Sequence, residues 1–260
     1  TCHNMGTRLR ERRLRWLFRL SLLRTARIAT VGEAARAHLV GAGLLPAART
    51  VALDNGIPVQ RFARGERARA AARELLGVPA DAPVLGCVGR LVALKTHALL
   101  IGVLPALRAR FAGLRLVLIG DGPLGAELAQ QVQSLGLGDC VKFAGDRSDV
   151  AQLLCAFDVF VQPSRTEGLS IALLEASASG CAIVASRVGG NPEIVAEGER
   201  GRLFESEDAA GLQAVLAELL ADAAQRHRLG DAARAWAERE VGIERARERY
   251  AALYAQALEG

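Results

Sequence analysis

The sequence predicts an α/β protein built on a doubly wound parallel sheet. From Pro83 onward, short apolar segments rich in β-branched residues alternate with helix-like segments, a pattern typical of a parallel sheet with helices on both faces. Apolar residues make up 51% of the 260 residues and aromatic residues only 4%, which favours helices packed on such a sheet. Polar or glycine-rich residues follow one predicted strand after another, where the ligand-binding loops of this fold are expected.

The first residues form a strongly basic segment. Residues 1–27 contain eight arginines against one acid, Glu11. Four of the arginines share one face of a predicted helix: Arg8, Arg12, Arg15 and Arg19. A domain helix with a solvated basic edge is the simpler interpretation, and contact with an anionic membrane surface is the alternative. Nucleic acid is disfavoured as a partner because the basic residues do not alternate with stacking aromatics.

Two strands and one helix are predicted next, and then a boundary. We expect strands at residues 26–31 and 50–53, with a helix at 33–40 between them. Asn55-Gly56 predicts a turn after the second strand, because this dipeptide favours turn conformations. The polar segment that follows Pro58 places a domain boundary near residue 60.

The larger unit contains five predicted strands. They are Val84–Val88, Leu114–Ile119, Val141–Phe143, Asp158–Val161 and Ala182–Ala185. A helix should begin at Ser170 and stop at Gly180, because glycine readily adopts the left-handed conformation that ends helices. Ser206 or Asp208 is placed to cap a last helix that reaches about Leu220.

The most informative stretch runs from Glu167 to Glu175, across a loop and a helix start. Backbone amides at a helix start lack partners inside the helix and attract anions. The amides in question belong to Gly168, Leu169, Ser170 and Ile171. Glu175 lies more than one turn further along, where its carboxylate can accept hydrogen bonds from hydroxyls. Amides for a diphosphate, with carboxylates for hydroxyls on either side, suit a sugar nucleotide. A glycoside hydrolase is disfavoured because the two carboxylates would lie at opposite ends of a ligand.

Basic side chains are predicted at the same edge of the sheet. Arg90 and Lys95 lie in the loop after the first strand of this unit, and lysine occurs elsewhere only at Lys142. A lysine kept among so many arginines suggests a need for a compact point charge. Two cations facing the amides would offset the charge on a departing diphosphate. Arg147, after the third strand, is a weaker candidate for the same anion.

A glycine-rich motif offers an alternative interpretation. Residues 120–125 match the G-x-G-x-x-G pattern of dinucleotide-binding loops, and Asp146 follows about 20 residues later. However, the motif follows the second strand of its unit, and Pro123 suits the first position of a helix. We therefore expect a turn that places Gly120 in the ligand-binding cleft. A nicotinamide-dependent oxidoreductase is the less favoured alternative.

The cysteines indicate a reducing compartment. They are scattered among apolar neighbours without close pairs, so neither disulfides nor a zinc site are expected. The five are Cys2, Cys87, Cys140, Cys155 and Cys181. No long uncharged apolar run is present, so we expect a cytoplasmic protein, peripheral at the inner face of the membrane if the basic segment binds lipid.

Together these motifs resemble the group 1, family 4 retaining glycosyltransferases of GT-B fold. The resemblance is carried by Gly89-Arg90-Leu91 with Lys95, by Gly120-Asp121-Gly122-Pro123, by Val141-Lys142-Phe143-Ala144-Gly145, by Pro163 to Gly168 with Glu175-Ala176, and by Val188-Gly189-Gly190-Asn191-Pro192-Glu193. It implies a Rossmann-like donor domain at 61–235, preceded at 1–60 by a partial second Rossmann-like domain that lacks its front half. A C-terminal helix at 236–260 would return to that first domain. Thr96 stands where the family often has glycine, which should affect only the loop backbone.

The resemblance also implies a role for each candidate residue. Arg90 and Lys95 would hold the donor diphosphate, and Glu167 would contact the donor sugar. The amides of residues 168–171 would line the phosphate and the sugar, and Glu175 would hold the ribose. His3 resembles the family's histidine at the acceptor side of the cleft.

The sequence therefore suggests a glycosyltransferase that moves a sugar from a nucleoside diphosphate sugar to a hydroxyl, with retained anomeric configuration. The catalytic candidates are His3, Arg90, Lys95 and Glu167. The acceptor would be a glycan or a lipid-linked hydroxyl in polysaccharide or glycolipid synthesis, and neither a metal nor another cofactor is expected. The alternative is a truncated nucleotide-sugar binding module without catalytic activity.

Overall fold

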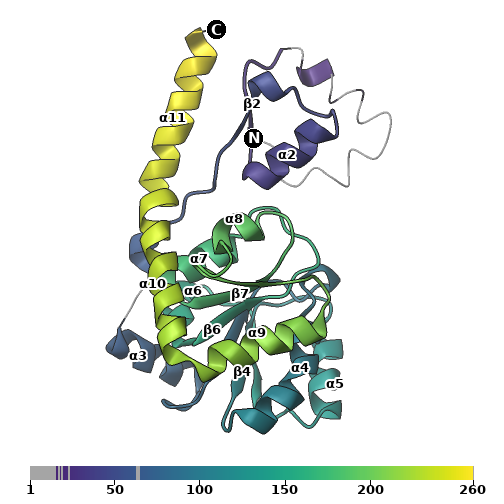
Figure 1. The fold of residues 1–260 in the computed structure, drawn as a ribbon, viewed down its shortest axis with the longest axis vertical. Coiled ribbons are helices and arrows are strands. Elements are labelled where there is room, and N and C mark those ends of the chain that lie inside the picture. Colours follow the sequence, from purple (N-terminus) through teal and green to yellow (C-terminus); the bar gives the residue numbers. More distant parts are fainter. Residues whose placement is uncertain (1–15, 17, 19, 23, 63–64, 260) are drawn as a thin grey trace.

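The computed structural model describes residues 16, 18, 20–22, 24–62 and 65–259. It comprises a large sheet domain and a smaller N-terminal unit (Figure 1). Several residues discussed above lie outside the described residues, namely His3, Arg8, Arg12, Arg15 and Arg19.

The sheet domain contains six parallel strands in the order β5-β4-β3-β6-β7-β8, which confirms the predicted architecture. They are β3 (Val84–Val88), β4 (Arg115–Ile119), β5 (Val141–Phe143), β6 (Val159–Gln162), β7 (Ala182–Ser186) and β8 (Gly201–Phe204). The chain adds β3 to β5 in one direction and β6 to β8 in the other. The order therefore reverses between β3 and β6, and ligands of such sheets bind at the carboxyl ends of the strands beside this reversal.

The edge strand β8 was not predicted from the sequence. Its residues, Gly-Arg-Leu-Phe, form neither a continuous apolar run nor a strict alternation, so no periodic signal marks them. Within the sheet the strand pairs with β7, and its Gly201 also forms an isolated bridge with Glu197. Gly201 is required there because a side chain would come within 2.6 Å of the Ile183 carbonyl oxygen.

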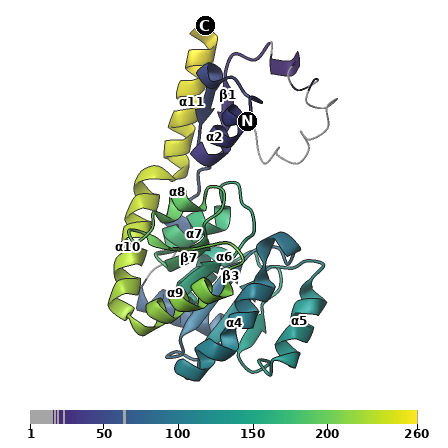
Figure 2. The same ribbon diagram turned by 45° about the vertical axis from the view of Figure 1, so that its right-hand side comes forward.

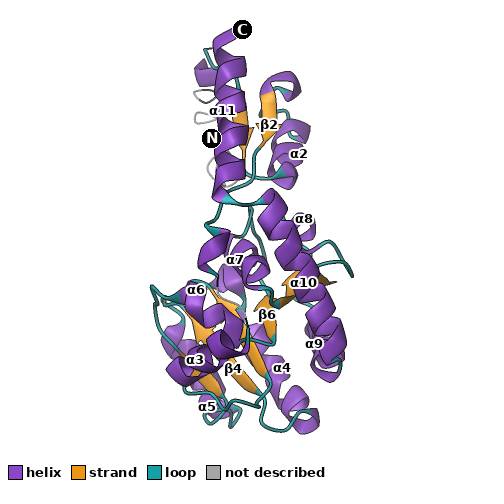
Figure 3. Ribbon diagram, turned by 90° about the vertical axis from the view of Figure 1, so that its left-hand side faces the viewer, coloured by secondary structure: helices purple, strands orange, loops and turns teal. Residues whose placement is uncertain are grey.

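Two layers of helices cover the sheet, as Figures 2 and 3 show from different sides. One layer consists of α4 (His97–Arg110), α5 (Gly125–Ser134) and α9 (Ala209–Ala221). The other consists of α3 (Glu66–Leu76), α6 (Val150–Leu153), α7 (Ile171–Ser179), α8 (Asn191–Val195) and α10 (Ala223–Glu240). Each layer buries its own apolar core against one face of the sheet, which explains why the central strands are apolar throughout.

The helix boundaries follow local capping chemistry. Ser170 caps α7 by accepting from the Leu173 amide at 3.4 Å, and Gly180 ends the helix in the left-handed conformation. Asp208 caps α9 by accepting from the Gly211 amide. These ends were predicted correctly.

The predicted position of Pro123 as the first residue of a helix was wrong. Helix α5 begins at Gly125, two residues later. The Leu124 amide donates to the Leu91 carbonyl oxygen at 3.1 Å, and the Leu91 amide donates to the Asp121 carbonyl oxygen at 2.9 Å. These bonds hold the turn at 121–124 against the neighbouring loop and keep it out of the helix.

The N-terminal unit is a small parallel pair of strands with one helix. It contains β1 (Ile28–Thr30), α2 (Glu33–Gly41) and β2 (Thr50–Ala52). Its apolar cluster is formed by Ile28, Leu39 and Leu45, with Phe18, Leu22, Val40 and Leu44 packed against it. The long helix α11 (Ile243–Glu259) runs beside this unit (Figures 1 and 3).

The C-terminal helix begins later in the chain than expected, because α10 (Ala223–Glu240) and α11 (Ile243–Glu259) are separate helices. Residue 236 lies inside α10, and the chain changes direction at Val241 and Gly242. There the Ile57 amide donates to the Val241 carbonyl oxygen at 2.9 Å, and the Ile243 amide donates to the Ile57 carbonyl oxygen at 3.0 Å. The linker between the two parts is thus anchored at the junction of α10 and α11. None of the described helices combines the length and apolar character needed to cross a membrane.

Two glycine substitutions should shift stability in opposite directions. A side chain at Gly86 would come within 2.0 Å of the buried Phe157 ring, so Gly86→Ala should lower the free energy of unfolding by about 1–3 kcal/mol through overpacking. Gly102 lies inside α4, and only the Gln131 side chain comes within 4 Å of the position of a Cβ atom there. Gly102→Ala should therefore raise the free energy of unfolding by about 0.5–1 kcal/mol, because glycine is unfavourable inside a helix. Urea unfolding of both variants measures the effects, and equal midpoints would contradict the packing described for β3.

Candidate functional site

Two loops meet where the strand order reverses, and they bring Lys95 and Glu167 together. Lys95 ends a short 3-10 helix (Ala93–Lys95) after β3, and Glu167 lies in the loop after β6. The Lys95 Nζ atom lies 2.5 Å from the Glu167 Oε1 atom. Gln162, the last residue of β6, donates to the same oxygen at 2.5 Å. The Glu167 side chain is only 10% exposed, so both contacts compensate the cost of burying its charge.

Further hydrogen bonds join the same two loops. The Arg165 amide donates to the Leu94 carbonyl oxygen at 2.8 Å, and the Thr96 hydroxyl donates to the Pro163 carbonyl oxygen. Thr96 adopts a left-handed conformation with φ of 45°, which is unfavourable for a β-branched residue. The hydroxyl bond to Pro163 offsets this cost.

The start of α7 presents unpaired amides next to this ion pair. Among the described residues, no acceptor is found for the backbone N–H groups of Gly168, Leu169, Ser170 and Ile171. The Gly190 amide donates to the Gly168 carbonyl oxygen at 2.8 Å, which fixes the peptide orientation in this loop. Amides at a helix start, together with the helix dipole, form a favourable position for an anion.

The other predicted cations occupy different environments. Arg90 is exposed, and within the described part of the chain its side chain makes no hydrogen bond or ion pair. The Arg147 guanidinium forms two hydrogen bonds with the Asp149 carboxylate, at 2.8 and 2.6 Å. Lys95 is therefore the predicted cation that the structure places beside Glu167, and Arg147 is paired with a different acid, Asp149.

Glu175 lies on α7, half-buried among apolar neighbours. Burial raises the pKa of its carboxyl group above the usual value, because a charged carboxylate is poorly solvated there. The sequence suggested that an acid in this position needs a buried partner. No described side chain forms a hydrogen bond or an ion pair with it.

The glycines of residues 120–125 are explained by contacts within the protein. A side chain at Gly120 would lie 2.2 Å from the Gly89 carbonyl oxygen, and one at Gly122 would lie 2.5 Å from the Leu91 carbonyl oxygen. Both glycines allow this turn to approach the loop that carries Arg90. Packing between two loops of the site therefore explains these glycines, and a bound dinucleotide is not needed to explain them.

A buried polar network below the loops was missed by the sequence analysis. The Gln162 Nε2 atom also donates to the Ser164 hydroxyl at 2.9 Å, and the Ser186 hydroxyl donates to the Ser164 carbonyl oxygen at 2.5 Å. Asn191 then donates to the Ser186 carbonyl oxygen at 3.0 Å. Gln162 and Ser186 are the last residues of β6 and β7, and a polar residue that closes an apolar strand is the sequence signal that could have identified them.

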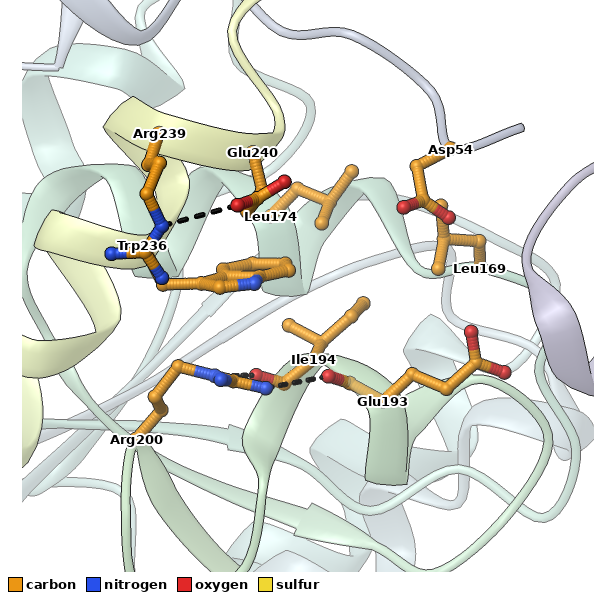
Figure 4. A pocket seen from close by; sticks show the side chains of 9 residues that line it. All are labelled: Asp54, Leu169, Leu174, Glu193, Ile194, Arg200, Trp236, Arg239 and Glu240. Carbon is orange, nitrogen blue, oxygen red and sulfur yellow. Dashed lines mark hydrogen bonds and ion pairs between the residues drawn. The ribbon is translucent and has the colours of Figure 1, made fainter. Parts of the chain in front are cut away.

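A cavity of about 370 Å³ lies beside this site, between the linker, α8 and α10 (Figure 4). The nine lining residues are Asp54, Leu169, Leu174, Glu193, Ile194, Arg200, Trp236, Arg239 and Glu240. The Arg200 guanidinium lies over the Trp236 ring at 4.8 Å and donates to the carbonyl oxygens of Glu193 and Ile194. The Lys95–Glu167 pair does not line this cavity. Leu169, two residues beyond Glu167, is the lining residue that belongs to the same loop.

No metal site is evident in the described ranges. They contain no group of three or more His, Cys, Asp or Glu side chains arranged to hold an ion. The four described cysteines are buried and free, namely Cys87, Cys140, Cys155 and Cys181.

Comparison with known proteins identifies the family. The profile of the family described as "Glycosyl transferases group 1" matches residues 68–236. The chain belongs to this family. The profile covers the sheet domain and both loops that carry Lys95 and Glu167.

Relatives of this chain carry glycosyltransferase names. It is 38% identical over 203 residues to a GDP-mannose-dependent alpha-(1-6)-phosphatidylinositol monomannoside mannosyltransferase of Mycolicibacterium smegmatis, a match that covers 74% of this chain and 52% of the relative. It is 35% identical over 189 residues to D-inositol 3-phosphate glycosyltransferase of Corynebacterium urealyticum, covering 69% and 45%. The chain thus spans about half the length of these relatives.

Solved structures of GT-B enzymes share the fold of this chain. Anabaena HepE in complex with UDP and glucose superposes with a TM-score of 0.88 at 25% identity, over 98% of this chain and 70% of HepE. Sucrose-phosphate synthase from Thermosynechococcus elongatus gives a TM-score of 0.84 at 26% identity, over 100% and 64%. The α/β fold predicted from the sequence is therefore the GT-B fold.

His97 is a buried histidine two residues beyond Lys95. It begins α4 and lines a separate cavity of about 460 Å³, and neither ring nitrogen has a described hydrogen-bond partner. Burial lowers the pKa of His97 to about 4, and the charge of Lys95 adds to this effect. The His97 imidazole is therefore neutral in the folded protein at neutral pH.

His97 should make the protein sensitive to acid. The unfolded chain binds a proton near pH 6.5 and the folded chain only near pH 4, so stability is complete above pH 6.5 and is lost as the pH falls toward 4. This linkage amounts to about 3 kcal/mol. Urea unfolding at several pH values should show a flatter profile for His97→Leu than for the unsubstituted protein. Parallel profiles would exclude His97 as the source.

Proposed function

We propose that this protein transfers a sugar from a nucleoside diphosphate sugar to a hydroxyl acceptor, with retained anomeric configuration. The observation that carries the proposal is the Lys95–Glu167 pair beside the unpaired amides at the start of α7. A cation and amides suit the diphosphate, and a carboxylate suits the hydroxyls of the sugar. The HepE structure with UDP and glucose supports this donor class. Retention is proposed because the motifs resemble those of retaining enzymes.

The proposed roles follow from charge and position. Lys95 and the amides of residues 168–171 would bind the diphosphate, whose charge increases as the bond to the sugar breaks. Arg90 would add a second cation from the same loop, because its exposed side chain has no competing acid among the described residues. Glu167 would accept from donor sugar hydroxyls, while Gln162 keeps the carboxylate in place.

Three further residues complete the proposed site. Glu175 would accept from the ribose hydroxyls, and the raised pKa of its carboxyl group marks a position that favours a hydrogen-bonding partner. Gly120 would lie at the edge of the donor site, next to Arg90, with Arg147 as a secondary cation. His3 would act on the acceptor side, and no metal is required in this scheme.

The acceptor is proposed to be a hydroxyl of a glycan or of a lipid-linked glycan. The relatives named above include a mannosyltransferase for a phosphatidylinositol mannoside and an inositol phosphate glycosyltransferase, which favours glycolipid synthesis. A cytoplasmic protein with a peripheral membrane contact is consistent with such an acceptor and with the arginines of residues 1–27.

A second candidate function is nucleotide-sugar binding without transfer. It is favoured by one observation, namely that every described residue assigned above serves the donor, whereas the acceptor-side candidate His3 lies outside the described residues. Calorimetry with UDP- and GDP-sugars, combined with an assay of transfer and of donor hydrolysis, separates the two functions. Binding without turnover in the whole protein would support the module and exclude the transferase.

Removal of either proposed diphosphate ligand should abolish most of the activity. Lys95→Ala and Arg90→Ala should each reduce turnover about a hundredfold or more, as expected for the loss of a charge that stabilises a leaving group. Lys142→Ala is the matched control, because Lys142 instead donates to the Leu76 carbonyl oxygen at the end of α3. Turnover is measured with the whole protein and a nucleoside diphosphate sugar. Full activity of both variants would reject the proposed roles.

A further inference from the structure

Glu193 makes a contact between the two parts of the molecule that the proposed mechanism does not use. It lies on the short helix α8 of the sheet domain, and its carboxylate reaches the start of α2 in the N-terminal unit. The Glu33 amide donates to Glu193 Oε2 at 2.9 Å, and the Ala34 amide donates to Oε1 at 2.5 Å. Helix α2 has no side-chain cap of its own, because its N-cap residue is Gly32. Glu193 therefore caps a helix of the other unit.

The geometry around Gly32 fits this carboxylate closely. A side chain at Gly32 would lie 3.4 Å from Glu193 Oε2 and 3.5 Å from the Leu169 side chain. Gly32 also has a φ of 84°, a conformation that favours glycine. The α2 start is thus in contact both with Glu193 and with the loop that supplies the proposed diphosphate amides.

Packing inside the sheet domain does not fix the Glu193 side chain. Figure 4 shows the side chain extending away from Arg200 and Trp236, while the Glu193 backbone carbonyl accepts from Arg200. The residue lines the cavity of about 370 Å³, so space is available beside it. The two amides of α2 are the described partners of its carboxylate, and a negative charge at this position is stabilised by the helix dipole.

The residues that lead into α8, which carries Glu193, are hydrogen-bonded to the loop of Glu167. The Gly190 amide donates to the Gly168 carbonyl oxygen at 2.8 Å. A side chain at Gly189 would come within 1.9 Å of the Glu167 carbonyl oxygen, so these backbones are in direct contact. A shift of the Glu167 loop therefore displaces the segment that ends in Glu193.

We propose that Glu193 is a positioning residue that fixes the N-terminal unit against the donor loop. This inference rests on the proposed function, since it assigns to Glu193 the alignment of the acceptor side with the donor sugar. Glu193 contacts neither substrate in this scheme. Its carboxylate holds the start of α2 at a fixed position relative to the loop at residues 167–168.

Hydrogen–deuterium exchange tests the contact without any substrate. In Glu193→Ala, amides in the first turn of α2 should exchange about tenfold faster, because two charge-assisted hydrogen bonds are lost. Glu193→Asp should behave like Ala because its carboxylate is one methylene shorter, whereas Glu193→Gln should show a smaller increase because it keeps an acceptor. The matched control is Glu199→Gln, a largely exposed acid beyond the end of α8. Unchanged exchange in the Ala variant would overturn the proposal.

Kinetics separate positioning from a general loss of structure. In the whole protein, Glu193→Ala should lower kcat for transfer at least about tenfold. The Kd for the nucleoside diphosphate, measured by calorimetry, should stay within about twofold because the donor loops lie within the sheet domain. Equal losses in donor affinity and kcat would overturn the proposal. If the unsubstituted protein bound no nucleotide, the proposed function would fail, and the exchange experiment would still decide the role of Glu193.

Discussion

The site depends on the ion pair between Lys95 and Glu167. Each residue comes from a loop that follows one of the two central strands, so the pair lies where the strand order reverses. A carboxylate that is only 10% exposed is unfavourable without compensation, and Lys95 and Gln162 provide it. Because removal of either partner leaves a buried charge or a buried amide unpaired, the pair links the stability of this region to the placement of its functional groups. The backbone bond from Arg165 to Leu94 holds the same loops together.

The polar network below these loops explains how a helix start can keep unpaired amides in a fixed orientation. Gln162, Ser164, Ser186 and Asn191 connect the ends of β6 and β7 through hydrogen bonds in a buried environment. The bonds that are formed hold these groups in place, because water does not replace a bond lost in a buried environment, although Gln162 Oε1 and Asn191 Oδ1 have no described partner. The loop at 167–171 is therefore preorganised, and an anion would meet amides whose orientation is already set.

The sequence predicted the sheet well because each central strand is buried on both faces and reads as an apolar run. It failed at β8, where an edge strand with Gly201 and Arg202 carries no such run. The family resemblance placed the start of the C-terminal helix at residue 236, whereas the structure divides the two helices at Val241 and Gly242. Lys95 and Glu167 could be identified from their places after predicted strands. Gln162 has a weaker signal, as a polar residue that closes an apolar strand, and its hydrogen bond to Glu167 was not predictable because it depends on loop conformation.

The contact of Glu193 with α2 was also inaccessible to sequence reasoning, and the cause is physical. A helix start capped by its own residue shows Ser, Thr, Asp or Asn at the N-cap, but here the cap comes from a residue 160 positions away. Among the described contacts, the linker is held by the hydrogen bonds of Ile57 and by the ion pair of Asp54 with Arg249, and α2 is held by Glu193. The linker alone would permit rotation of one unit about the other. A second contact, attached to the loop at 167–168, restricts this rotation, so under our proposal the acceptor side would take its position from the same backbone that presents the proposed diphosphate ligands.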